Sequence, residues 1–184
     1  MAHGAFRIFD CDLHVVEPPD LWQKYIDPQY KSVAPVGLSE YPVDLRIRVG
    51  EKVRPRNSLI RPPADKKDAF YIKRERRFGE AHRRGWGSDV QLEAMDAEGV
   101  DLAVLFPSRG LWVIADDEMD PSYAAAIARA YNNWLADFCR YAPNRLYVLR
   151  HEQSHPGAVW EMAWTRHLYR SGGQLLAVQA RGGR

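Results

Sequence analysis

Three residues that can bind a metal ion occupy every second position near the start of the chain: Asp10, Asp12 and His14. They end an apolar run that is typical of a strand, in which alternate side chains lie on the same face. A carboxylate and an imidazole would then lie side by side just before a turn at Pro18-Pro19. Carboxylate oxygen and imidazole nitrogen are both good ligands for Zn²⁺ or Mn²⁺. The spacing therefore predicts Asp12 and His14 as metal ligands.

The neighbours of this pair have more than one interpretation. Asp-x-His often occurs by chance, and Asp20 can simply be the N-cap of a helix over residues 21–25. Asp10 is expected behind the metal site, where a hydrogen bond would orient a ligand. Glu17 is expected either behind the ligands or facing a substrate. Cys11 should point to the opposite side of the strand and pack as a buried thiol.

The elements that would position such a site follow further along the chain. A sequence that resembles a capping box predicts a helix over 88–98, ended by Gly99. The continuous apolar run at 100–106 is typical of a buried parallel strand. An Asp-Pro pair then begins a helix over 121–140, with apolar residues at 3.6-residue spacing, and 145–149 is the next strand. This alternation predicts an α/β fold with a parallel sheet.

Residues 27–87 are expected to form an insertion after the first strand. The stretch 27–42 is rich in turn-forming residues. Apolar and charged residues alternate through 43–53 around Gly50, which predicts a small hairpin with one exposed face. The stretch 71–84 is basic, has few apolar positions and is expected to be partly helical.

The chain resembles the amidohydrolase-related family, which includes aminocarboxymuconate-semialdehyde decarboxylase and the resorcylate-type decarboxylases. Members begin with a strand that ends in His-x-His, Glu-x-His or Asp-x-His, often followed by Glu-Pro. Three segments carry the resemblance, in order: Asp12-Leu13-His14 with Glu17-Pro18, LEAMDAEGVDLAVLFPSRGL at 92–111, and AAAIARAYNNWLADFCRYAPNRLY at 124–147. The resemblance implies a (β/α)8 TIM barrel that holds its metal at the carboxyl ends of the strands.

We expect that barrel to be incomplete in this chain. A barrel of this kind needs about 250 residues, whereas the sequence has 184. Residues 1–184 are therefore interpreted as one partial domain, the N-terminal part of a barrel with an insertion. In the family the other ligands and the general acid or base come from later strands, so the catalytic residues are not predicted here. Residues 150–184 depart from the family pattern, with a helix over 157–168 and a strand over 174–179 expected.

The resemblance also implies a metal-dependent enzyme without an organic cofactor. A decarboxylase of an aromatic or unsaturated carboxylate is slightly favoured over a hydrolase of an amide, ester or lactone, and a homodimer is expected. The substrate would be a small carboxylate or carbonyl compound. Arg109, just past the second strand, could bind a substrate carboxylate through two hydrogen bonds, or be a surface loop charge.

Composition leaves two other classes open. With 46% hydrophobic and 27% charged residues the chain is typical of a globular protein, and with no signal peptide or apolar span we expect it in the cytoplasm. Residues 46–84 contain 14 Lys or Arg against 5 Asp or Glu. Interleaved aromatic residues make nucleic-acid binding conceivable there, although no nucleic-acid fold motif is present and we rank it well below an enzyme. An inactive truncated product is the remaining alternative.

Overall fold

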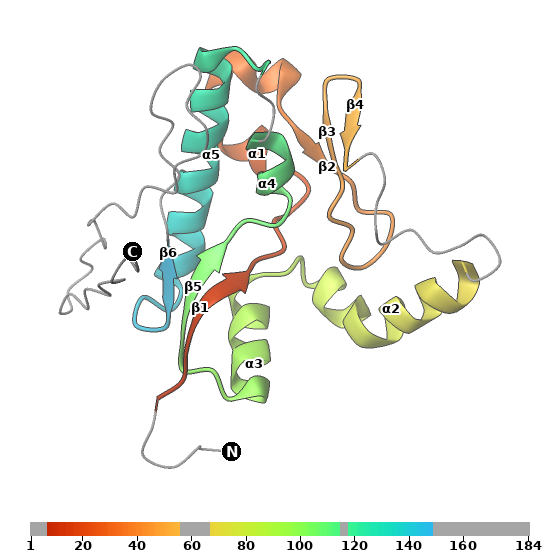
Figure 1. The fold of residues 1–184 in the computed structure, drawn as a ribbon, viewed down its shortest axis with the longest axis vertical. Helices are drawn as coiled ribbons and strands as arrows, with labels where there is room; N and C mark the ends of the chain where they lie inside the picture. Colours follow the sequence, from red (N-terminus) through yellow and green to blue (C-terminus); the bar gives the residue numbers. More distant parts are fainter. Residues whose placement is uncertain (1–6, 56–66, 115–117, 149–184) are drawn as a thin grey trace, which may run out of the picture.

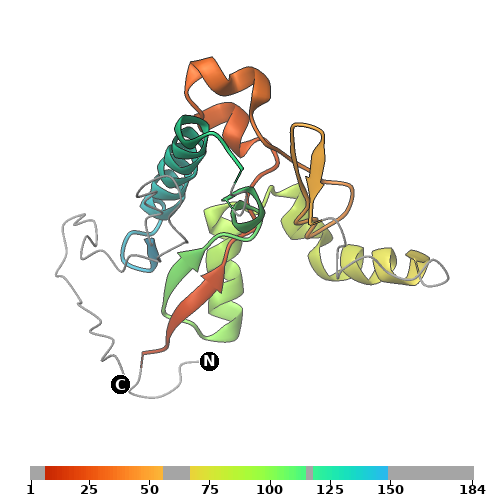
Figure 2. The ribbon, with the colours of Figure 1, turned by 45° about the horizontal axis from the view of Figure 1, so that its top comes forward.

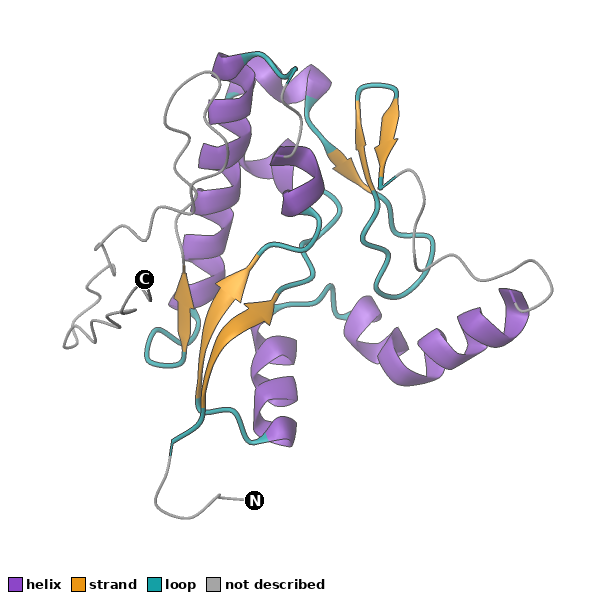
Figure 3. Ribbon diagram, in the orientation of Figure 1, coloured by secondary structure: helices purple, strands orange, loops and turns teal. Residues whose placement is uncertain are grey.

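Two three-stranded sheets organise the molecule, one parallel and one antiparallel. The computed structural model describes residues 7–55, 67–114 and 118–148. Helices pack beside the parallel sheet, and the antiparallel sheet lies to one side of it (Figures 1 and 3). The predicted α/β class with a parallel sheet is confirmed, while the described strands form an open sheet rather than a closed barrel.

The parallel sheet has the order β1 (Phe9–His14), β5 (Leu102–Phe106) and β6 (Leu146–Val148). Both neighbouring pairs are parallel. The apolar sequence of β5 suits its central place, where Ala103 and Leu105 are almost wholly buried. His14 of β1 lies opposite Phe106 of β5, so the two strands end at the same level. This register brings the residues after each strand to one edge of the sheet.

Helix α5 (Pro121–Arg140) is the main packing partner of the sheet and begins as the sequence predicts. The Asp120 side chain accepts a hydrogen bond from the backbone N–H of Tyr123 at 2.9 Å, which caps the first turn. Its apolar stripe is buried, with Tyr131 and Leu135 at most 1% exposed. β6 lies beside the C-terminal end of α5 (Figure 1), and Figure 2 shows α5 from another side. One apolar cluster joins α5, the sheet, α1 (Leu21–Tyr25) and α3 (Ser88–Glu98).

The insertion folds into a short 3-10 helix, η1 (Pro28–Val33), and the antiparallel strands β2 (Val36–Gly37), β3 (Ile47–Val49) and β4 (Lys52–Arg54). The predicted hairpin is confirmed, because β3 pairs with β4 around Gly50, whose φ is +57°. Such a φ is readily adopted by glycine, which has no Cβ.

Helix α2 (Lys67–Arg83) is longer than the sequence pattern predicts. Its few apolar residues pack locally, since the rings of Phe70 and Tyr71 contact Tyr41. The Arg74 guanidinium also donates a hydrogen bond to the carbonyl of Pro42 at 3.0 Å. The contacting residues, Tyr41 and Pro42, lie 29 to 32 positions earlier in the chain, so helical periodicity could not reveal these contacts.

Two expected helix caps are wrong in detail. Helix α3 has Gly87 as its N-cap, and the Ser88 hydroxyl instead donates to the Phe138 carbonyl at 2.8 Å, which ties α3 to α5. Asp20 does precede α1, but its side chain makes no capping bond and pairs with Lys24 at 2.8 Å. In both places the side chain that the sequence pattern predicts as a helix cap bonds to another partner instead.

Cys11 is exposed, so the prediction of a buried packing thiol is wrong. Within the described residues β1 is an edge strand of the parallel sheet. Phe9, on the same strand, is also 44% exposed. Alternation predicts on which face of a strand a side chain lies, but burial of that face requires a covering element, which alternation cannot supply.

Gly99 closes α3 in the left-handed conformation, with φ +76° and its N–H bonded to the Asp96 carbonyl. Replacing Gly99 by alanine should lower the free energy of unfolding by about 1 kcal/mol, because an L side chain is strained at this φ. Urea unfolding would measure the loss. Gly99→Asn should cost less, since Asn tolerates this region, and equal losses for Ala and Asn would contradict the backbone explanation.

The expected helix over 157–168 and strand over 174–179 lie outside the described residues. Among the described helices, none is both long enough and apolar enough to cross a membrane.

Candidate functional site

Asp12 and His14 lie side by side at the carboxyl end of β1. His14 Nε2 is 3.8 Å from Asp12 Oδ1, and both side chains are accessible, 46% and 76% exposed. His14 Nδ1 is 2.7 Å from the Pro107 carbonyl oxygen. A carbonyl can only accept, so the proton of the neutral ring belongs on Nδ1 and the lone pair on Nε2. The loop after β5 thus fixes the imidazole with its free nitrogen toward the carboxylate.

This pair fits two positions of a divalent metal site. Ligating histidines usually donate their second nitrogen to a carbonyl or carboxylate, as His14 does to Pro107. One oxygen and one nitrogen donor suit Zn²⁺ or Mn²⁺. Over residues 7–55, 67–114 and 118–148, no group of three or more His, Cys, Asp or Glu is arranged to hold a metal. A complete site would need further donors besides Asp12 and His14.

Asp10 acts on the strand backbone rather than on the imidazole. Its Oδ1 accepts a hydrogen bond from the Asp12 N–H at 2.9 Å. The pairing of β1 with β5 is irregular between Asp10 and Leu13, so strict alternation is interrupted in the part of the strand that contains Asp12. Asp10 therefore holds the backbone at Asp12 through a hydrogen bond. The sequence led us to expect a hydrogen bond from Asp10 that orients a metal ligand.

Glu17 is fully buried and anchors the loop after β5. Its Oε1 accepts from the backbone N–H groups of Ser108 at 2.9 Å and Gly110 at 3.0 Å, and its Oε2 accepts from Arg109 N–H at 2.8 Å. Because the carboxylate is 0% exposed and engaged, it presents no free oxygen to a substrate. Of the two expectations for Glu17, a place behind the site agrees with this geometry.

Burial raises the pKa of Glu17 above its ordinary value of 4.5, although the backbone hydrogen bonds from Gly110 and Arg109 act in the opposite direction. Gly110 begins the short helix α4 (Gly110–Ile114). A side chain at Gly110 would meet Pro107 and approach Glu17 Oε1 to 3.3 Å. The tight loop around Glu17 therefore requires glycine there.

Arg109 is 2% exposed, so the interpretation of a surface loop charge is wrong. Its Nη1 donates to the Leu38 carbonyl at 2.8 Å, which joins the loop after β5 to the insertion. Burial lowers the pKa of Arg109, while the nearby carboxylates of Glu17 and Asp44 oppose that shift. Whether Arg109 binds a substrate stays a prediction.

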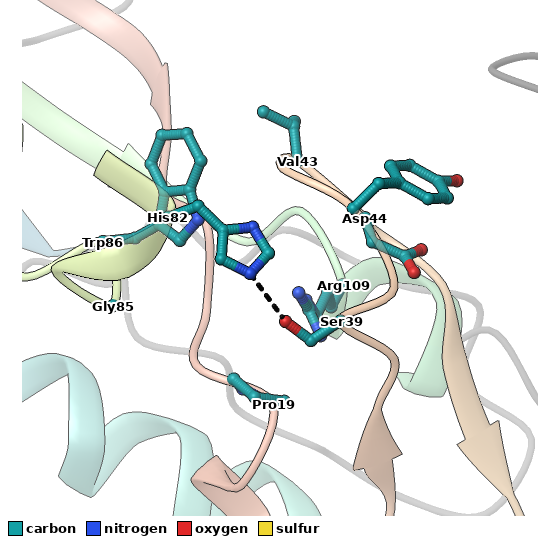
Figure 4. A pocket seen from close by; sticks show the side chains of 9 residues that line it. Pro19, Ser39, Val43, Asp44, His82, Gly85, Trp86 and Arg109 are labelled. Carbon is teal, nitrogen blue, oxygen red and sulfur yellow. Dashed lines mark hydrogen bonds between the residues drawn. The ribbon is translucent and has the colours of Figure 1, made fainter. Parts of the chain in front are cut away.

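A pocket lies beside Arg109, between the start of α1, the loop at 38–44 and the end of α2 (Figure 4). Sequence reasoning missed its other polar residues, Ser39, Asp44 and His82. His82 Nε2 lies 3.2 Å from Ser39 Oγ. No motif joins these residues: Ser39 and Asp44 lie five positions apart, and His82 follows Asp44 by 38 positions. The only sequence signal is that His82 and Trp86 bracket a turn at Gly85.

The comparisons with known proteins include a likeness in fold to a solved structure. Neither protein-family models nor curated protein sequences match the chain. The crystal structure of an amidohydrolase from Mycobacterium avium subsp. paratuberculosis is similar, with a TM-score of 0.52 and 18% sequence identity. The alignment covers 79% of this chain and 42% of the amidohydrolase, so the match spans less than half of that protein. At this identity the likeness shows the fold: the chain is built like part of an amidohydrolase.

Proposed function

We propose that this chain provides the first strands and the first two metal ligands of a metal-dependent enzyme of the amidohydrolase type. The observation that carries the proposal is the Asp12–His14 pair at the carboxyl end of β1, with the imidazole oriented by Pro107. Active sites of (β/α)8 enzymes are built at this end of the strands. The fold shared with an amidohydrolase supports the same reading.

In this proposal four residues of the chain have distinct roles. Asp12 and His14 would hold the ion, the Pro107 carbonyl keeps the His14 ring in one orientation, and Glu17 holds the loop that carries Pro107. A bound divalent ion supplies Lewis-acid polarisation of a substrate oxygen or activation of a water molecule. The general acid or base and the remaining ligands are expected from residues other than these.

We favour slightly a decarboxylase of an aromatic or unsaturated carboxylate over a hydrolase of an amide, ester or lactone. The support is the acidic-plus-histidine opening of the chain, Asp12 and His14, which resembles that of decarboxylases. Both reactions use the same ion and the same two ligands, so these residues do not separate them. A full-length relative assayed against both substrate classes would decide between them.

In the described parts of residues 46–84, ion pairs within the chain argue against nucleic-acid binding. Three arginines of this stretch face carboxylates of the same molecule: Arg46 pairs with Asp44 and Glu40, Arg83 with Glu75 and Glu80, and Arg84 with Asp89 and Glu93. Paired arginines offer less charge to phosphates.

Metal uptake by the purified 184-residue chain tests the proposal. The chain is dialysed with Zn²⁺ or Mn²⁺ and free metal is removed. Elemental analysis should then find close to one metal ion per chain. Asp12→Asn and His14→Gln should each weaken binding on the order of 10- to 100-fold, and the double variant should abolish it, because each removes one donor.

Asp96→Asn is the matched control, since it removes an accessible carboxylate on α3, far along the chain from the pair. Equal uptake by the wild type and the double variant would overturn the proposal. A folded wild-type chain that takes up no metal would instead support the inactive alternative.

A further inference from the structure

The pocket beside Arg109 contains a buried guanidinium that forms no ion pair with a carboxylate of the described residues. The Arg109 side chain makes one hydrogen bond to a described residue, from Nη1 to the Leu38 carbonyl. Its Nε is buried without a hydrogen-bond partner, and no described carboxylate lies within ion-pair distance of the guanidinium. A buried charge without a hydrogen-bonded counterion is costly. The arrangement is understandable if a ligand supplies the missing acceptors.

The chain is shaped to hold the guanidinium at this place. A Cβ on Gly37 would overlap Nη1 of Arg109 and lie 2.7 Å from Pro19 Cα, so only glycine leaves room for the side chain against β2. Glu17 fixes the Arg109 backbone from the other side through the N–H at 2.8 Å. Both ends of the residue are therefore positioned before any ligand arrives, which reduces the entropy cost of binding.

Two further polar groups accompany Arg109 in the pocket. Figure 4 shows the His82 ring directed toward Ser39, with the Arg109 guanidinium next to the serine. His82 Nε2 and Ser39 Oγ are 3.2 Å apart, while His82 Nδ1 is buried with no partner among the described residues. Guanidinium, imidazole and hydroxyl are all able to donate hydrogen bonds to an oxyanion.

One carboxylate, that of Asp44, also lines the pocket, but it is already engaged. Its oxygens accept hydrogen bonds from Arg46 Nε at 2.8 Å and Nη2 at 2.7 Å, and from the backbone N–H groups of Arg46 and Glu40. Arg46 therefore occupies the Asp44 carboxylate, and the carboxylates of Asp44 and Glu17 lie near Arg109 without accepting a hydrogen bond from its guanidinium. The remaining walls are apolar or aromatic, including Pro19, Val43 and Trp86.

We propose that this pocket is a binding site for a small carboxylate attached to a flat apolar body, with Arg109 as its anchor and Ser39 and His82 as accompanying donors. The carboxylate matches the planar guanidinium fork, and the apolar body matches Trp86 and Val43. The site is separate from the Asp12–His14 pair, neither of which lines the pocket, and it requires no metal.

Calorimetric titration of benzoate into the full chain tests this inference, with EDTA present so that metal binding plays no part. Benzoate should bind saturably. Arg109→Met should weaken binding on the order of 10- to 100-fold, because it removes a charge-assisted donor pair, and Arg109→Lys should give an intermediate loss. Gly37→Ala should also weaken binding, since it displaces the guanidinium without changing its charge.

Arg83→Gln is the matched control, because it removes one positive charge from α2 next to His82 but does not line the pocket. It should bind benzoate as the wild type does. Benzamide, which has the same body without the charge, and inorganic phosphate, which has the charge without the body, should both bind more weakly.

The wild-type chain alone provides a second measurement, independent of whether any variant folds: benzoate should raise the thermal unfolding midpoint more than benzamide does. Absence of saturable benzoate binding by the wild type would overturn the inference, as would unchanged binding by folded Arg109→Met. Phosphate binding as tight as benzoate would overturn the carboxylate assignment. Because EDTA is present, failure here leaves the metal proposal standing, and failure of metal uptake leaves this inference standing.

Discussion

Replacing Glu17 by alanine should lower the free energy of unfolding by about 3–5 kcal/mol. The carboxylate is 0% exposed and accepts three backbone hydrogen bonds, from Ser108, Arg109 and Gly110. Removing it leaves three N–H groups without their acceptor, those of Arg109 and Gly110 buried and that of Ser108 partly buried, and opens a cavity beneath the loop. An unsatisfied buried donor costs about 1–3 kcal/mol. Urea unfolding followed by circular dichroism measures the loss.

Two other variants make this result interpretable. Glu17→Gln keeps the size and one carbonyl oxygen, so it should lose less stability than Glu17→Ala. Glu118→Ala, at a side chain that is 88% exposed, is the control for loss of a glutamate and should change stability by less than about 0.5 kcal/mol. A Glu17→Ala loss as small as that of the control would show that the loop does not depend on Glu17.

The pH dependence of stability should carry the signature of Glu17. Burial raises the pKa of Glu17 above 4.5 in the folded chain. Between the ordinary and the raised value, the folded state holds a proton that the unfolded state has released. Stability should therefore fall as the pH rises through this window, and Glu17→Gln should lack that contribution. A wild-type contribution that rises with pH would mean that the three N–H donors outweigh burial.

Local patterns were sufficient to predict the regular elements near the sheet. The apolar run at 100–106, the Asp-Pro start of α5 and the strand over 145–149 depend on neighbours in sequence, and the structure has β5, α5 and β6 there. The parallel class follows from their alternation. The length of α2 did not follow, because ring contacts and the Arg74 hydrogen bond to a distant loop support it.

The site shows the same division between local and long-range information. The two-residue spacing predicted Asp12 next to His14, and the structure has them 3.8 Å apart despite the irregular pairing of β1, whereas the partner that orients the ring, Pro107, is 93 positions away. Burial of Glu17 and Arg109 likewise depends on the meeting of β1 with the loop after β5 and on the fold of the insertion. A carboxylate and an arginine in turn-rich sequence normally indicate exposed positions, so composition pointed away from the answer.

Asp44 provides the second prediction of large effect. Its side chain is 0% exposed and pairs with Arg46 through Nε and Nη2 at 2.8 and 2.7 Å. Replacing Asp44 by alanine should cost about 3–5 kcal/mol, because the partly buried Arg46 would keep only the exposed Glu40 as a partner and the backbone N–H groups of Glu40 and Arg46 would lose their acceptor. Urea unfolding measures the loss, and Arg83→Gln, which breaks exposed ion pairs only, should cost less than about 1 kcal/mol.

Acid should act on Asp44 in the direction opposite to Glu17. Burial alone would raise the pKa of Asp44, but hydrogen bonds from the Arg46 side chain and from the N–H groups of Arg46 and Glu40 outweigh it and hold the pKa below 3.8. The stabilisation is therefore present above the ordinary value and is lost as the pH falls through the lowered one. Asp44→Asn should flatten this acid limb, while Glu17→Gln should leave it intact. If Asp44→Asn kept the wild-type acid limb, the proton uptake would belong to other carboxylates. The Asp44–Arg46 pair would then not be the source of this pH-dependent stability.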